Sequence, residues 1–248
     1  DPLIVQSYFP LVSTLKTSFN VSVELVALSL TFHMLPLAVL SLFSGTLSDF
    51  SHRPRILMYG LYVSSIGSLL GVSSPNILTF LLSRSIQGIG SALIMPISLA
   101  LIGDIAPREY IGKAMGVYAV FSGLFAMTLG PLISGFLASV EWRLVPVLFG
   151  TYTLIIGTVS RVVLRNVPTS PKKGTVSGVF RQLGCASKDR SVVMVSAVSF
   201  LSMFSFQGMQ PLISNTFSLS PVLMKKSEIG ILFSTAGFVG MFFSYGGG

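Results

Sequence analysis

The side chains best placed to do chemistry lie in a short polar stretch at residues 45–55 (GTLSDFSHRPR), between two long apolar runs. Asp49 follows the first run, and Arg53 and Arg55 precede the second. A carboxylate and two guanidinium groups in this setting can pair with each other, with lipid headgroups or with the end of a neighbouring helix. The third possibility, pairing with a helix end, would make this stretch part of a conformational change.

Another arginine, Arg84, lies inside a long apolar run together with Gln87, Gly88, Gly90 and Ala92 (RSIQGIGSA). An arginine there is costly if it faces lipid, so we expect it to face a bundle interior or a wet cavity. The two glycines would let another backbone or a ligand approach closely. The alternative is that Arg84 extends outward to the headgroups while the glycines only pack helices.

Few other ionisable or polar groups stand out in the apolar runs. Asp1 is the acidic residue placed to lie in a first helix, where a carboxyl group could bind and release a proton. His33 could also titrate, although a lone histidine on an apolar helix is more often hydrogen-bonded structure. Gln207 and Gln210 precede Pro211, and they either form a substrate-facing turn or hydrogen-bond neighbouring helices.

Enzyme chemistry finds little support in the composition. Two His and one Cys leave almost no material for a metal site or a disulfide. The sequence contains no HExxH motif, no phosphate-binding loop and no serine–histidine–aspartate set at workable spacing. We therefore predict no catalytic residues, no metal and no cofactor, and any pumping would have to use an ion gradient.

The elements that position these residues are expected to be membrane helices. The chain is 51% hydrophobic and only 10% charged, with a mean hydropathy of +0.80, whereas soluble domains are about 25% charged. About 20 apolar residues cross a bilayer. The sequence predicts the end of a first span at 1–15, followed by spans at 23–48, 54–73, 76–103, 111–139, 143–164, 191–213 and 228–246.

Basic residues are distributed unevenly over the predicted connections. One set of alternate connections holds eleven of them: Arg53, Arg55, Arg108, Lys113, Arg161, Arg165, Lys172, Lys173, Arg181, Lys188 and Arg190. The opposite set holds four: Lys16, Arg143, Lys225 and Lys226. The positive-inside rule then places 45–55 and the long stretch 165–190 in the cytoplasm. The net charge of +8 is explained by topology and contact with membrane lipid, without a nucleic-acid partner.

The run 111–139 carries a stripe of small residues. Their steps alternate between four and three, as Gly112, Gly116, Ala119, Gly123, Ala126 and Gly130. This spacing puts them on one helix face, which suits close packing against another helix. Pro131 follows, and Gly135 comes four residues later. The final run offers a partner stripe, Gly230, Ser234, Gly237, Gly240 and Ser244.

Three of these motifs, in this order, resemble those of the major facilitator superfamily, and the resemblance spans the whole chain. The Gly45-x-Leu47-x-Asp49-x-x-x-Arg53 stretch is similar to the loop between helices 2 and 3 of that family. The run from Arg84 to Ala92 is similar to the helix-4 motif of its proton-driven members. Gly130-Pro131-x-x-x-Gly135 resembles the helix-5 motif of its drug:proton antiporters.

The chain departs from the family pattern at several positions. Phe50, His52 and Pro54 stand where other residues are usual in the loop, and Ala126 and Ser134 replace glycines of the helix-5 motif. We expect the role of the loop to depend on Asp49, Arg53 and Arg55.

The resemblance implies an all-α integral membrane protein that works by alternating access between two six-helix bundles of inverted repeats. This chain would be a fragment with about eight of the twelve helices. The expected parts are an N-terminal bundle at 1–164, a cytoplasmic linker at 165–190 and the start of a C-terminal bundle at 191–248.

The function implied is secondary active transport, with proton-coupled efflux of small lipophilic compounds or drugs across the plasma membrane by a monomer. Asp49, Arg53 and Arg55 would hold the cytoplasmic side shut, and Asp1, Arg84 and Gln87 would serve proton coupling. Two alternatives are an importer or facilitator of a sugar or organic anion, and a non-transporting membrane sensor.

Overall fold

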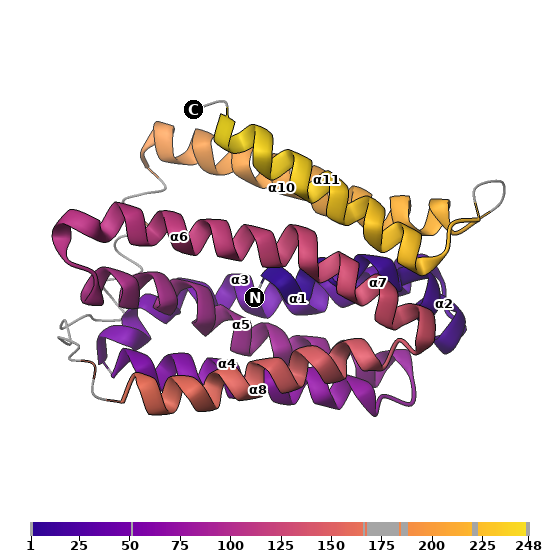
Figure 1. Cartoon of the computed structure of the whole chain (residues 1–248), viewed down its shortest axis with the longest axis horizontal. Helices are drawn as coiled ribbons and strands as arrows, with labels where there is room; N and C mark the ends of the chain where they lie inside the picture. Colours follow the sequence, from indigo (N-terminus) through magenta and orange to yellow (C-terminus); the bar gives the residue numbers. More distant parts are fainter. Residues whose placement is uncertain are drawn as a thin grey trace.

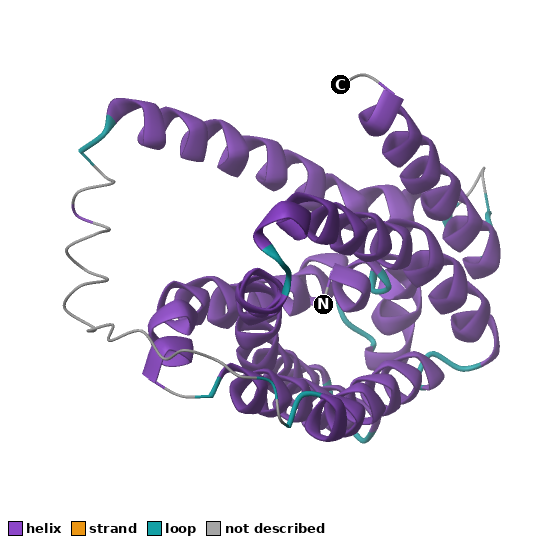
Figure 2. Cartoon of the chain, turned by 60° about the vertical axis from the view of Figure 1, so that its left-hand side comes forward, coloured by secondary structure: helices purple, strands orange, loops and turns teal. Residues whose placement is uncertain are grey.

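The computed structural model describes residues 2–50, 52–165, 167, 184, 188–219 and 223–246, and the regular secondary structure of this part is helical (Figure 1). The elements are α1 (Pro2–Gln6), η1 (Phe9–Leu11), α2 (Val12–Phe19), α3 (Val23–Phe50), α4 (Arg53–Val72), α5 (Ile77–Ile105), η2 (Arg108–Tyr110), α6 (Ile111–Gly123), η3 (Leu124–Leu129), α7 (Gly130–Val140), α8 (Leu144–Val163), α10 (Arg190–Phe217) and α11 (Lys226–Gly246). Figure 2 shows that short loops join most of them.

Six stretches of the described residues are long and apolar enough to cross a membrane. They are Val23–Gly45, Arg53–Val72, Ile77–Ile105, Arg108–Val140, Leu144–Val163 and Arg190–Phe217. These six, together with the helices at 2–19 and 226–246, lie where the sequence predicts spans.

The first predicted span ends later than expected. The chain remains helical to Phe19, because Asn20 is the residue that adopts the left-handed conformation (φ 51°) and ends the helix. Lys16 therefore lies in the last turn of α2 and not in the connection that follows.

The polar stretch 45–55 is mostly helix and not loop, which corrects the sequence interpretation. α3 continues to Phe50 and α4 begins at Arg53. His52 is extended, with φ −64° and ψ 109°, and Pro54 follows in the first turn of α4. Proline suits that position because its fixed φ is already helical and its missing N–H has no helical partner there.

Glycines bring α3, α4 and α5 into close contact. A methyl group at Gly90 of α5 would collide with the backbone nitrogen of Ser64 in α4, and one at Gly67 would collide with the backbone of Gln87. A methyl group at Gly88 would collide with the carbonyl oxygen of His33 in α3. Because lipid gives helices no hydrophobic reason to associate, such close backbone packing is a main source of their affinity.

Hydroxyl groups join α4 to α8. Ser65 donates a hydrogen bond to the carbonyl oxygen of Gly150 over 2.7 Å, and Ser68 donates to that of Pro146 over 3.0 Å. Both bonds are buried. A cluster of rings closes one end of this bundle, with Phe80 stacked on Tyr8 at 5.6 Å and edge-on to Trp142 at 6.0 Å between centroids.

α10 and α11 meet the other helices near the end that carries α2 and α7 (Figure 1). Ser214 of α10 donates a hydrogen bond to the Phe9 carbonyl over 2.6 Å, and Lys226 at the start of α11 donates to the Ala138 carbonyl over 3.1 Å. Toward its other end, the described side chains of α10 between residues 190 and 205 are exposed. α10 therefore contacts the N-terminal helices through its last two turns.

The α4–α5 contact makes a testable prediction. We expect Gly90→Ala to lower the free energy of unfolding by about 1–3 kcal/mol, because the added methyl group must push two backbones apart. Gly103→Ala is the matched control in the same helix, since nothing lies within 4 Å of a methyl group there. Thermal unfolding of the complete protein in detergent measures both; an equal effect of the two substitutions would show that the contact is not tight.

Candidate functional site

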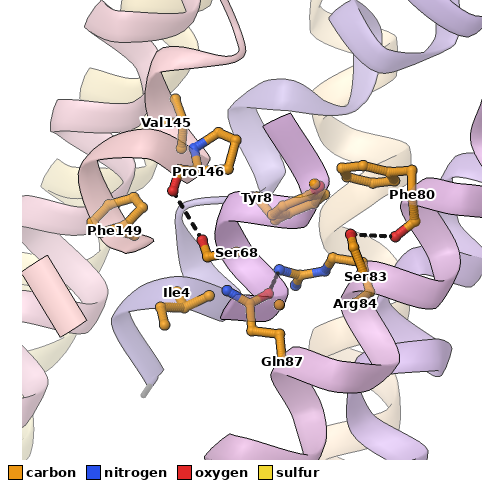
Figure 3. A pocket seen from close by; sticks show the side chains of 12 residues that line it. Ile4, Tyr8, Ser68, Phe80, Ser83, Arg84, Gln87, Val145, Pro146 and Phe149 are labelled. Carbon is orange, nitrogen blue, oxygen red and sulfur yellow. Dashed lines mark hydrogen bonds between the residues drawn. The ribbon is translucent and has the colours of Figure 1, made fainter. Parts of the chain in front are cut away.

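The side chain of Arg84 is buried in the third turn of α5, with 3% of its surface exposed. Its guanidinium carbon lies 4.0 Å from the ring centroid of Tyr8, which is a cation–π contact. Its Nη1 donates a hydrogen bond to Oε1 of Gln87 (Figure 3). Arg84 thus faces the bundle interior, and the alternative of an outward extension to the headgroups is wrong.

The hydrogen bonding of Arg84 is incomplete. Its Nε and Nη2 have no hydrogen-bond partner within the described part of the chain. A cavity of about 10 Å³ lies beside it, lined by residues of four segments (Figure 3), which is room for about one water molecule. A buried cation with two unfilled donor groups is a natural partner for an anion.

His33 lies close to this arginine. Its carbonyl oxygen abuts Gly88, which is one helical turn from Arg84, and none of its surface is exposed. Neither ring nitrogen has a hydrogen-bond partner among the described residues. The choice between a structural and a titrating role for His33 therefore stays a prediction.

At the start of α4, Arg53 pairs with Asp104 near the end of α5. Its Nη1 lies 2.6 Å from Oδ2 of Asp104 and also donates to the Ala100 carbonyl over 3.3 Å. The arginine and aspartate side chains are 10% and 26% exposed. The sequence does not predict this pair, because its partners are 51 residues apart along the chain.

The other residues of the 45–55 stretch are less defined. Arg55 is exposed, Leu47 is 45% exposed, and Gly45 lies within α3. The side chain of Asp49 lies outside the described part, as does the whole of Asp1. Their proposed roles thus remain predictions.

The helix-5 motif forms a seam with α11, as the sequence predicts. A methyl group at Gly135 would lie 2.8 Å from Cα of Gly230, and Ser234 donates a hydrogen bond to the Thr128 carbonyl over 2.6 Å. Pro131 and Ser134 are buried there, together with Ala126 and Gly130. The surroundings of Gly237, Gly240 and Ser244 lie outside the described part.

The seam is shorter than the stripe of small residues predicts. Gly112, Gly116 and Ala119 are exposed, and nothing lies within 4 Å of a methyl group at either glycine. The helix is π-helical at η3, where the Gly130 N–H bonds to the Phe125 carbonyl. A π turn rotates the residues before it relative to those after it, and Pro131, which lacks an N–H, favours the irregularity.

Gln207 and Gln210 lie on an uninterrupted α10 that runs through Pro211 to Phe217, so the predicted turn is wrong. Gln210 is 9% exposed, and neither amide oxygen has a hydrogen-bond partner among the described residues. Helix–helix hydrogen bonding by these oxygens is thus not observed, and the substrate-facing role of both residues remains a prediction.

The family model of the Major Facilitator Superfamily matches residues 2–248. The chain belongs to this superfamily. A solved structure with this fold, a bacterial homologue of the human lysosomal transporter Spinster in an inward-facing and occupied conformation, superimposes with a TM-score of 0.71. The match covers 98% of this chain and 57% of that structure at 16% identity, so it supports the fold alone.

Curated members of the superfamily match shorter stretches. A riboflavin transporter of Clostridioides difficile is 30% identical over 122 residues, which are 49% of this chain and 26% of that protein. A quinolone resistance protein of Staphylococcus aureus is 33% identical over 141 residues, which are 56% of this chain and 35% of that protein. The matched stretches thus span about a quarter to a third of these superfamily members.

The Arg53–Asp104 pair makes a second prediction. In a double-mutant cycle of Arg53→Gln and Asp104→Asn, we expect a coupling free energy of about 1–3 kcal/mol, because the short, partly buried pair is poorly screened. The exposed pair Arg143 and Glu141, 3.8 Å apart, is the control, and its coupling should stay below about 1 kcal/mol. Unfolding in mixed detergent micelles measures both cycles; no difference between them would contradict the assignment.

Proposed function

We propose that this chain is part of a secondary active transporter that exports small lipophilic compounds or drugs from the cytoplasm in exchange for protons. It works in the plasma membrane by alternating access. The proposed parts are a six-helix bundle at 1–164, a cytoplasmic linker at 165–190 and the start of a second bundle at 191–248. The protein acts as a monomer and needs no cofactor.

The observation that carries this proposal is the buried, incompletely bonded guanidinium of Arg84. A cation in that setting favours a carboxylate partner, and protonation of the carboxylate would weaken their attraction. We assign the carboxylate to Asp1, which lies seven residues before Tyr8 in the same N-terminal segment. Gln87 orients the guanidinium through its hydrogen bond. Uptake and release of one proton would then alter the charge balance at the centre of the bundle.

Two features support rocking of the bundles. The α7–α11 seam brings two helix backbones together with few side chains between them, so the helices can slide or pivot without repacking large groups. The Arg53–Asp104 pair ties the start of α4 to the end of α5. With Asp49 and Arg55 it would form the cytoplasmic latch, and Gln207 and Gln210 would face the substrate path.

Efflux is favoured over uptake by the antiporter-type helix-5 motif and by the likeness to a quinolone resistance protein. The likeness to a riboflavin transporter keeps a metabolite substrate as the second candidate. The direction of flux distinguishes the two.

The third prediction tests coupling. In proteoliposomes of the complete protein with an imposed pH gradient, we expect Asp1→Asn to abolish proton-driven flux of a quinolone or a lipophilic cationic dye. Glu24→Gln is the control, because it also neutralises a carboxylate but at an exposed position. Undiminished pH-driven transport by Asp1→Asn would refute the coupling role. Gradient-driven accumulation of riboflavin in the uptake direction would favour the second candidate.

A further inference from the structure

A basic groove opens between α4 and α8 at the end of the bundle that carries the α3–α4 connection. Its volume is about 870 Å³, and it is lined by His52, Pro54, Arg55, Met58, Tyr59, Tyr62, Ser160, Arg161, Val162, Leu164 and Arg165. We refer to this set as the basic groove. It is separate from the cavity beside Arg84, with which it shares no lining residue.

The two walls of the basic groove come from α4 and from the end of α8. On α4, Arg55, Tyr59 and Tyr62 follow one another at steps of four and three, so they share a face. On the other wall, Arg161 lies in the last turn of α8, and Arg165 follows two residues after its end at Val163. Gly157 lets the two helices approach closely, because a methyl group there would lie 2.9 Å from the Tyr62 ring.

The charges of the basic groove are uncompensated. Arg55, Arg161 and Arg165 are exposed, and none has an ion pair or side-chain hydrogen bond in the described segments of the chain. The lining contains no aspartate or glutamate. Three guanidinium groups and the ring of His52 therefore converge on a space that no carboxylate of the lining neutralises.

The groove also has apolar lining residues. Val162 is 72% exposed and Tyr59 is 57% exposed, and Met58 lies one position before Tyr59. Tyrosine and arginine together are typical of the interfacial layer, where headgroups meet acyl chains. The groove thus combines exposed cations with exposed apolar and aromatic surface.

We propose that the basic groove binds the phosphate of an anionic phospholipid from the surrounding leaflet, with an acyl chain along Met58 and Val162. Arginine suits this role because its planar fork binds two phosphate oxygens at once. The positive-inside rule explains why basic residues lie at this end of the bundle, but it does not explain their convergence with two tyrosines in one groove.

The experiment is lipid binding to the complete protein in detergent, measured by native mass spectrometry. The lipid probes are phosphatidylglycerol and phosphatidylcholine with the same acyl chains, and the soluble probe is glycerol 3-phosphate. Arg161→Gln/Arg165→Gln removes two charges from the groove. Arg108→Gln/Lys113→Gln removes two charges from exposed positions at the same end of the bundle but outside the lining.

We expect phosphatidylglycerol to bind more tightly than phosphatidylcholine, and the groove variant to weaken that binding by at least about tenfold. The control variant should bind phosphatidylglycerol as tightly as the parent protein. Arg161→Lys/Arg165→Lys should keep most of the affinity because the charge remains. If the double glutamine variant does not fold, Arg165→Gln alone, at the exposed end of the groove, gives the same comparison.

Three results would overturn the proposal. An equal loss of affinity for phosphatidylglycerol in the groove and control variants would show that only the general surface charge matters. Equal affinity for the two lipids would exclude recognition of the anionic headgroup. Displacement of phosphatidylglycerol by glycerol 3-phosphate at equal concentration would identify a soluble phosphate as the ligand.

Discussion

The positive charge of Arg84 inside the bundle is the constraint on which its surroundings depend. An arginine away from water must find partners within the protein, and two are present, the face of Tyr8 and the amide oxygen of Gln87. Tyr8 lies in the helical turn between α1, which ends at Gln6, and η1, which begins at Phe9. This first segment therefore supplies the ring that covers the arginine.

Close backbone contact is what encloses that charge. Gly67 admits the backbone of Gln87, and Gly88 admits the carbonyl of His33, so α3 and α4 pack tightly on both sides of the Arg84 turn. The small cavity that remains is about the size of one water molecule. A proton that reached this centre would meet Arg84, His33 and little bulk solvent.

Much of this arrangement could be predicted from the sequence, because it follows from how deep a charged residue lies in a membrane-spanning helix and from how small the packing residues are. The inward position of Arg84 follows from the cost of exposing it to lipid, and the contact of Gly135 with Gly230 follows from matching small-residue stripes. The Arg53–Asp104 pair could not be found in this way, since its partners are 51 residues apart and only the fold brings them together. The π turn at 124–129 depends on how the backbone accommodates Pro131, and the sequence does not predict it. Gly112 and Gly116, which precede this turn, lie outside the seam.

The central claim is that a carboxyl group whose state depends on Arg84 gains and loses a proton. Infrared difference spectroscopy of the reconstituted complete protein, between acidic and alkaline buffer, records the C=O stretch of protonated carboxyl groups directly. We predict a carboxyl band that is missing in Asp1→Asn and displaced in Arg84→Lys. The same band in the parent protein and both variants would contradict it.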